Sequence, residues 1–179
     1  MKKLKKFFDK LLNPTVIILF AVTLRLVPHP PNFAPIAAMA LFGGAYLNRG
    51  YVIFVPLLAL FLSDVLIGFY SPLVMFSVYG SFVLTGLMGL WLKKRKSAGN
   101  VVLTAMGASI LFFLVTNFAV WAAGAYARDL SGLAQSYVMG LPFFRNTLLG
   151  DLFYTGVFFG GYELVLGLVR KPAVAVIEK

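Results

Sequence analysis

Long apolar runs alternate with short polar breaks along most of the chain. The runs cover Thr15–Val27, Phe33–Leu47, Tyr51–Phe69, Leu73–Leu92, Val101–Ala125 and Leu141–Val169. An apolar stretch of about 20 residues suffices for a helix to cross a bilayer, and the breaks contain proline, glycine or clustered cations, which end helices. The pattern predicts an all-α integral membrane protein built as a bundle of six transmembrane helices.

Two shorter amphipathic segments accompany the runs. Met1–Leu12 places five lysines beside leucines and phenylalanines, which favours lying on an anionic membrane surface. In Tyr126–Gly140, apolar residues recur at helical spacing after Asp129 or Ser131, either of which can cap a helix. We expect a short outer-loop helix there, suited to act as a lid. The chain thus divides into an N-terminal segment (residues 1–12), a single membrane domain (residues 13–171) and a tail (residues 172–179).

The first apolar run has a length typical of the hydrophobic region of a signal peptide as well as of a short membrane helix. Arg25 interrupts it, and no small-x-small cleavage site follows. We therefore interpret Thr15–Val27 as the first span. Pro28–Asn32 then forms a stiff, extended loop, because proline cannot continue a helix and restricts the residue before it.

Charge sets the expected orientation in the membrane. The chain is 60% hydrophobic and 12% charged, with a formal net charge of +10. Its basic residues gather in short blocks, above all at the N-terminus and at Lys93–Lys96, and such blocks stay on the cytoplasmic side. We expect a multi-pass protein with both termini in the cytoplasm, and with Pro28–Asn32 and Tyr126–Gly140 outside. Because the blocks act as orientation signals, the lipid bilayer is an expected partner and nucleic acid is not.

The residue inventory excludes several kinds of chemistry. The chain has no cysteine, and His29 is its only histidine, so disulfides, thiolate metal sites and imidazole metal clusters are excluded. No nucleophile stands beside a base in a recognisable motif. We therefore expect no metal, no cofactor and no enzymatic activity. A lipid-directed enzyme that uses Asp64 and Asp151 as acid and base is a less favoured alternative.

Polar side chains within the apolar runs are the candidate functional residues. A charge near the centre of a membrane helix costs about 2.5–3.5 kcal/mol, so it needs a partner or a ligand. Arg145 and Asp151 are six residues apart, about 600° of helix rotation, and therefore face different ways. Counting the helical rise from the ends of the runs places most of these polar groups at one level in the outer half of the membrane, which predicts an outward-opening pocket. The candidate ligand-binding residues are Arg25, His29, Asn32, Asp64, Tyr79, Asn117, Trp121, Arg145, Asn146, Asp151 and Tyr154.

A purely structural interpretation of the same residues stays open. Asp64, Asp151, Arg25 and Arg145 can form two ion pairs that fix the helix register, with Asn117 bonding across a helix interface. Small residues at four-residue spacing in Phe33–Leu47, such as Ala40 and Gly44, predict a tightly packed interior helix. Small-residue faces of this kind also suit a scaffold that holds partner helices.

Three stretches carry a resemblance to a known family: RLVPHPPNFAPIAAMALFGGAY, LLALFLSDVLIGF and LPFFRNTLLGDLFYTG. They resemble a family of small, uncharacterised bacterial membrane proteins described as transport proteins, over roughly residues 22–165. That family is similar in layout to the S components of energy-coupling-factor (ECF) vitamin transporters, which have six helices, cytoplasmic termini and a ligand pocket near the outer face.

The resemblance implies a function and a location. It implies a substrate-binding membrane transport protein of the bacterial cytoplasmic (inner) membrane, S-component-like or a solitary transporter, which takes up a small polar or vitamin-like molecule. Pro28–Asn32 would correspond to the first outer loop, which closes over the ligand in S components. An energising transporter module is a further implied partner, although Thr15–Val27 lacks the Ala-x-x-x-Ala pattern of S components that dock on a shared module. The alternative is a non-catalytic scaffold or assembly protein of the cell envelope.

The six-span topology can be tested by labelling, because the chain has no native cysteine. Single substitutions Ser97→Cys and Ser131→Cys are expected to react with a membrane-impermeant thiol reagent from opposite sides of the membrane. Intact cells should label the second variant alone, and permeabilised cells should label both. Labelling of both variants in intact cells would rule out the six-span arrangement.

Overall fold

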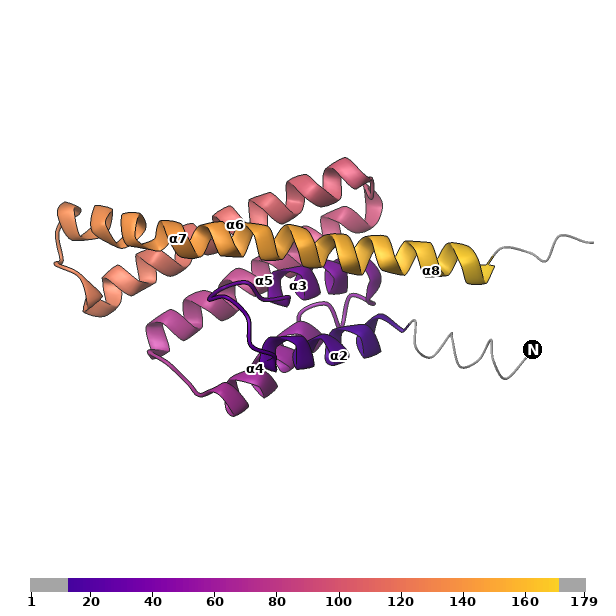
Figure 1. Ribbon diagram of the computed structural model, residues 1–179, viewed down its shortest axis with the longest axis horizontal. Helices are drawn as coiled ribbons and strands as arrows, with labels where there is room; N and C mark the ends of the chain where they lie inside the picture. The colour runs from indigo at the N-terminus through magenta and orange to yellow at the C-terminus, as the bar shows by residue number, and fades with distance from the viewer. Residues whose placement is uncertain (1–12, 171–179) are drawn as a thin grey trace, which may run out of the picture.

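The computed structural model describes residues 13–170, and every element of regular structure in that range is helical (Figure 1). The elements are α2 (Pro14–Leu26), α3 (Ile36–Tyr46), α4 (Phe54–Ile67), α5 (Pro72–Lys94), α6 (Ala98–Val120), the π-helical turn η1 (Trp121–Ala125), α7 (Leu130–Thr155), the π-helical turn η2 (Gly156–Gly160) and α8 (Gly161–Arg170). The predicted all-α class is therefore confirmed for these residues. The expected N-terminal segment, residues 1–12, and the tail, residues 172–179, lie outside the described range.

Local sequence signals set the ends of the first helix. The side chain of Asn13 accepts a hydrogen bond from the Thr15 N–H at 2.9 Å, and Pro14 occupies the first helical position, where its missing N–H costs nothing. The helix ends at Leu26 because Val27, which precedes Pro28, adopts an extended conformation. The loop predicted from the prolines therefore begins where the sequence places it.

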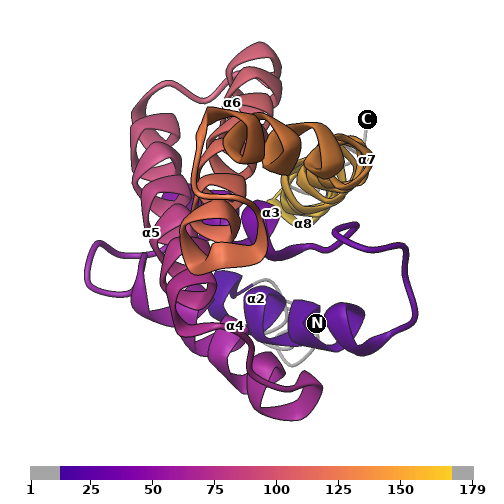
Figure 2. The same cartoon turned by 90° about the vertical axis from the view of Figure 1, so that its left-hand side faces the viewer.

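Helix α3 forms the centre of the bundle. Every residue from Ile36 to Ala45 is buried, and α3 packs against α5 along much of its length. Viewed from one end, α2 and α4 lie on one side of α3 and α5, and α6 and α7 lie on the other (Figure 2). The predicted tightly packed interior helix is confirmed.

Glycine allows α3 and α5 to approach this closely. A Cβ atom added at Gly89 would lie 2.8 Å from the Cα atom of Gly44 and would also collide with the carbonyl oxygen of Leu41. A Cβ atom added at Gly44 would collide with the backbone of Gly86 and Gly89. The contact is therefore one of backbone against backbone, as small residues at helical spacing permit.

The segment expected as a separate outer-loop helix is instead the first part of α7. Asp129 caps the helix by accepting a hydrogen bond from the Gly132 N–H at 2.7 Å, and the helix then runs through Pro142 to Thr155. It continues through η2 into α8 as one long rod (Figure 1). Proline removes a single backbone hydrogen bond, and α6 holds the segment before it, because the Tyr137 hydroxyl donates to the Leu114 carbonyl at 2.9 Å. The prediction of a detached lid helix at residues 126–140 was wrong.

Within residues 13–170, two helices are long and apolar enough to cross a membrane: α5 and the continuous run Ala98–Ala125 of α6 and η1. In their most apolar stretches only 28% and 33% of the residues are buried, in contrast to α3. Helices α2, α3 and α4 are apolar but shorter. The arrangement in six spans stays a prediction.

The glycine contact between α3 and α5 predicts a difference between two substitutions on the same helix. Gly89→Ala should lower the stability by about 1–3 kcal/mol, because the added methyl group meets backbone atoms that cannot move aside. Gly80→Ala is the matched control, since a Cβ atom there meets nothing within 4 Å. It should leave stability unchanged or raise it by about 0.5–1 kcal/mol through helix propensity. Thermal unfolding in detergent, followed by intrinsic fluorescence, checks both; equal melting temperatures would contradict the close approach.

Candidate ligand cavity

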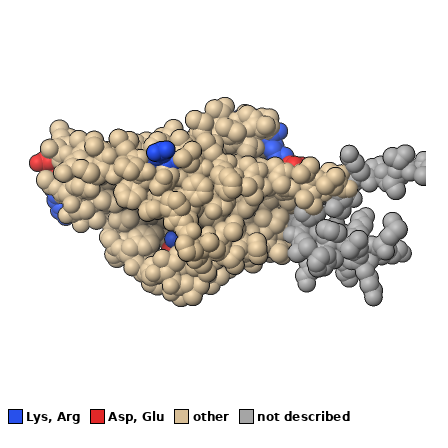
Figure 3. Space-filling view, in the orientation of Figure 1, with Lys and Arg blue, Asp and Glu red and all other residues tan. Residues whose placement is uncertain are grey.

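A cavity of about 470 Å³ opens between the two sides of the bundle. Residues of α2, the loop after it, α3, α5, α6 and α7 line it, and its volume falls in the range of small-molecule sites. In the space-filling view a hollow shows atoms of both charge signs, in a face whose other charged atoms lie at its two ends and in one basic spot on its upper edge (Figure 3). Within residues 13–170 no group of three or more His, Cys, Asp or Glu side chains could hold a metal ion.

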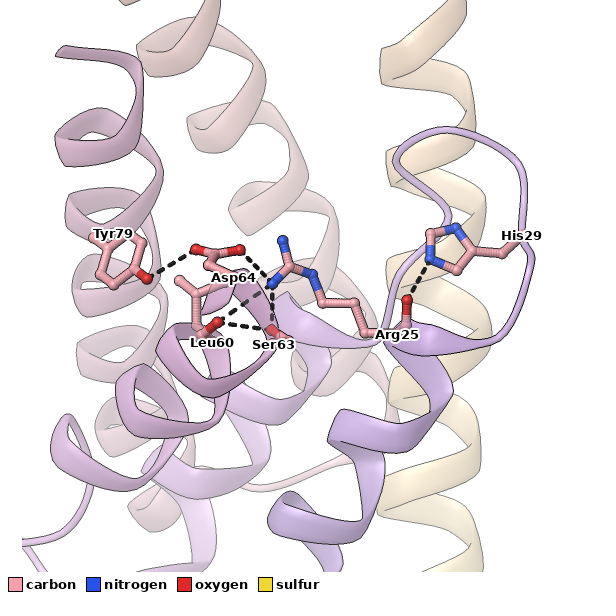
Figure 4. A network of polar contacts seen from close by, with 6 residues as sticks. All are labelled: Arg25, His29, Leu60, Ser63, Asp64 and Tyr79. Carbon is pink, nitrogen blue, oxygen red and sulfur yellow. Dashed lines mark hydrogen bonds and ion pairs between the residues drawn. The ribbon is translucent and has the colours of Figure 1, made fainter. Parts of the chain in front are cut away.

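Arg25, at the end of α2, forms a buried ion pair with Asp64 of α4. Its Nη1 atom donates to Asp64 Oδ1 at 2.6 Å, and it also bonds the Ser63 hydroxyl and the Leu60 carbonyl (Figure 4). The Tyr79 hydroxyl donates to the other carboxylate oxygen, Asp64 Oδ2, at 2.8 Å. Both oxygens of this fully buried carboxylate are therefore occupied, and Asp64 and Tyr79 lie behind Arg25 and do not line the cavity. Their geometric role is to position Arg25.

Part of the Arg25 guanidinium remains available to the cavity. Its Nε and Nη2 atoms have no hydrogen-bond partner among the described residues, and its side chain is 16% exposed. Figure 4 shows the second terminal nitrogen pointing away from the bonded edge. The free edge is a pair of parallel N–H donors, the geometry that binds carboxylate or phosphate oxygens.

The proline-rich loop contributes His29 and Asn32 to the cavity wall. The His29 ring nitrogens lie 3.3 Å from the Arg25 carbonyl oxygen and 2.9 Å from the Pro30 carbonyl oxygen. Asn32 adopts a left-handed backbone conformation (φ 64°), which asparagine tolerates better than most residues. Asn146 of α7 donates to the Pro31 carbonyl at 3.0 Å. The loop is thus tied at one end to α2 and at the other to α7.

Asp151, on α7, brings the second buried acid to the cavity. It is 2% exposed, and its Oδ2 atom accepts a hydrogen bond from the Ser109 hydroxyl of α6 at 2.6 Å. Its Oδ1 atom has no partner in the part of the chain that the structure describes. No cation of that part lies within ion-pair distance of the carboxylate. Asp151 therefore differs from Asp64, whose acceptor capacity is already used.

The α6–α7 wall supplies further polar atoms. The amide of Asn117 packs against Gly140, where any side chain would collide with it, and its Nδ2 atom donates to the Phe113 carbonyl at 2.8 Å. The Ser136 hydroxyl donates to the Asn117 carbonyl at 2.7 Å. These contacts leave the Asn117 side-chain oxygen as an acceptor for a group in the cavity.

Aromatic residues line the cavity between these polar walls. The rings of Phe82 and Phe112 stack with centroids 5.4 Å apart. Tyr70, between α4 and α5, also lines the cavity; burial, aided by the Asp64 charge, raises its pKa to about 12. It remains a neutral phenol that can donate a hydrogen bond at physiological pH.

The structure brings together five of the residues predicted from sequence: Arg25, His29, Asn32, Asn117 and Asp151 all line the cavity. Asp64 and Tyr79 are connected to it through Arg25.

Four predicted residues lie outside the cavity lining. Arg145 is exposed on α7, and none of the described residues pairs with it. Asn146 holds the loop, and the Trp121 indole donates to the Ala127 carbonyl at 2.9 Å. Tyr154 packs against Phe33, with ring centroids 5.6 Å apart. Of the two ion pairs in the structural alternative, Arg25–Asp64 is present, whereas Asp151 and Arg145 are not paired with each other.

Sequence reasoning did not select Ser109, Tyr70 or Tyr126. Ser109 is buried in a run of small residues on α6, and this run is the one signal that could have identified it. Tyr70 and Tyr126 lie at helix ends, where an aromatic residue is equally typical of a membrane interface.

The fold and the cavity together define an all-helical, strongly apolar bundle with a polar-lined cavity near one end. The chain belongs to the family of unknown function DUF6580, whose family model matches residues 5–174. No curated protein and no solved structure matches the chain.

The two buried acids should respond differently to neutralisation. Asp64→Asn leaves the Arg25 guanidinium partly buried without its counter-charge, which should cost about 3–5 kcal/mol. Asp151→Asn keeps the side-chain volume and an oxygen for Ser109, so it should cost about 1 kcal/mol or less. Melting temperature and the yield of monodisperse protein measure the difference, with Arg145→Gln as a surface control. Equal losses for the two acids would show that Asp151 is also a structural partner.

Proposed function

We propose that this chain is a multi-pass protein of the bacterial cytoplasmic (inner) membrane that binds a small polar or vitamin-like molecule from outside. It would serve in uptake either as an S-component-like substrate-binding subunit or as a solitary transporter. The observation that carries the proposal is the cavity. Its lining joins Arg25 and Asp151, two ionisable side chains from separate helices, in a chain that is 60% hydrophobic.

The outer surface of the bundle supports a location in lipid. Large apolar side chains are exposed on α2, α4, α5 and α6, for example Phe20 (68%), Leu66 (69%) and Phe76 (72%). Soluble monomers rarely expose contiguous apolar patches above a few hundred Å². Most charged atoms of the face in Figure 3 lie at its ends, where headgroups and water would meet them, apart from the hollow and one basic spot on the upper edge. Six apolar helical segments, with α7, η2 and α8 forming the last, then cross the bilayer.

The distribution of cations supports an outward-opening cavity. Tyr70, Val74 and Val78 line the cavity at the beginning of α5, whereas Lys93 and Lys94 occupy the other end of the same helix. Because clustered cations stay in the cytoplasm, the cavity end of α5 faces outward. Both termini are then cytoplasmic, and the loop at Pro28–Asn32 lies outside.

The loop suits the role of a gate. It lines the cavity through His29 and Asn32, and a single side-chain hydrogen bond, Asn146 to Pro31, joins it to α7. Releasing that bond would free one end of a short, stiff segment, which is the usual construction of a moving lid. In the S-component-like form of the proposal, an energising module would be the partner that drives release inward.

The scaffold alternative has less support from the packing. The small residues of α3 that suit close helix contact are buried within the chain, against α5. They are therefore not available to partner helices. A scaffold also has no need of a cavity lined by a buried carboxylate with an unused oxygen.

Native mass spectrometry of gently purified protein tests the proposal. The wild-type protein should carry a bound small molecule, and Arg145→Gln should retain it, because Arg145 lies outside the cavity lining. Asn117→Leu should lose it, because leucine keeps the volume but removes the polar atoms from the cavity wall. Absence of any adduct from the wild-type protein, together with no small molecule in its denatured extract, would overturn the binding function.

A further inference from the structure

The two charged groups of the cavity stand on opposite walls. Arg25 comes from α2, which packs against α4, and Asp151 comes from α7, which packs against α6. Figure 2 shows these two helix pairs on either side of α3 and α5. The cavity therefore has two chemically different ends, and each end retains hydrogen-bonding capacity that the protein does not use.

The Arg25 end offers donors only. Asp64 neutralises the guanidinium from behind, through Nη1 at 2.6 Å, and both Asp64 oxygens are occupied by Arg25 and Tyr79. The Nε and Nη2 edge of Arg25 has no partner among residues 13–170, and Arg25 lines the cavity. Such an edge recognises an oxyanion, a carboxylate or phosphate, by two parallel hydrogen bonds.

The Asp151 end offers an acceptor. Its Oδ2 atom is held by Ser109 at 2.6 Å, and its Oδ1 atom is unpartnered in the described part of the chain. The residue is only 2% exposed, and Ser109 is its one hydrogen-bond partner among residues 13–170. Among these residues, Arg25 is the one lysine or arginine in the cavity lining, and it is already paired with Asp64. A protonated nitrogen on a ligand would supply both the missing donor and the missing charge.

The space between the two ends is apolar and aromatic. Phe82 and Phe112 stack there, and Val74 and Val78 of α5 add aliphatic surface. This lining suits the carbon framework of a ligand, a ring included.

We propose that the ligand of this cavity is amphoteric: it carries an oxyanionic group that binds Arg25 and a protonated nitrogen that binds Asp151, separated by an apolar framework. The inference rests on the proposed binding function. A purely anionic, purely cationic or uncharged molecule would leave the unused hydrogen-bonding atoms of at least one end without a matching partner.

Capture from a defined mixture tests the ligand class. Purified protein in detergent is incubated with the low-molecular-mass fraction of yeast extract, washed and denatured, and the released molecules are identified by mass spectrometry. The expected molecule has one acidic group and one protonatable nitrogen. Capture of a molecule that lacks either group overturns the inference and leaves the binding function standing. If nothing is captured above a detergent blank, the proposed function itself fails.

Two substitutions test which group of the ligand binds at each end of the cavity. Arg25→Lys keeps a cation for Asp64 but removes the two-donor edge, and Asp151→Asn removes the charge at the other end. Each should weaken binding of the captured molecule about tenfold or more, with Arg145→Lys unchanged. Melting temperatures show whether each variant is folded.

Blocked forms of the captured molecule complete the test. The methyl ester, which lacks the oxyanion, should bind the wild-type protein more weakly than the free acid, and its affinity should not change further in Arg25→Lys. The N-acetyl form lacks the protonatable nitrogen, so its affinity should not change in Asp151→Asn. The reverse pattern would contradict the assignment of the two ends. If Arg25→Lys does not fold, the test uses the wild-type protein alone and compares its affinity for the methyl ester with its affinity for the free acid. Equal affinities would overturn the oxyanion site.

Discussion

The ion pair between Arg25 and Asp64 is the interaction on which the cavity end of the bundle depends. It joins the end of α2 to the last turn of α4, and Tyr79 extends the connection to α5. Asp64 is held by its backbone as well, because the Gly68 N–H, at a position whose φ of 113° favours glycine, donates to its carbonyl at 2.8 Å. The Arg25 carbonyl in turn lies 3.3 Å from the His29 ring, so the loop that borders the cavity begins at the same pair. The Arg25–Asp64 pair thus connects α2, α4, α5 and the loop that follows α2.

Helix α3 gives the rest of the bundle its layout. Because it is buried along almost its whole length, the helices on its two sides contact it and do not fill the space between themselves at the loop end. The cavity occupies that space, with α3 residues Ile36 and Ala37 in its lining. The close glycine contact with α5 lies toward the other end of α3, at Gly44 and Gly89, and holds together the two helices that stand between the charged walls.

Local sequence signals predict where a helix ends and how far along it a residue lies, but not which way its side chain faces. The end of α2 before Pro28 follows from local signals. Arg25, Asn117 and Asp151, which the helical rise places at or near the level of the predicted pocket, line the cavity. Whether a side chain at that level faces the cavity depends on which neighbour covers each face, and this packing has no local signature. Arg145 shows the limit, since it lies at a suitable depth on an exposed face of α7.

The same limit applies to contacts between elements far apart in the chain. Ser109 and Asp151 are 42 positions apart, and nothing in either local sequence indicates that they bond. The continuation of α7 through Pro142 depends likewise on support from α6, which the residues around the proline do not reveal. The fold class and part of the cavity were thus accessible from sequence, whereas the pairing of its polar atoms required the packed structure.

The π-helical turn at Gly156–Gly160 bears on how the length of this chain can vary. A π-helical turn holds about one residue more than an α-helical turn, so it absorbs an extra residue without rotating the next part of the helix. Removing one residue within η2 would leave Asp151 facing the cavity and Glu163 beside Lys96 at the other end of the rod. The same deletion elsewhere between those two residues would turn one against the other by about 100°. Among chains of this family, a length difference within this rod is therefore expected at η2, where both of its ends keep their contacts.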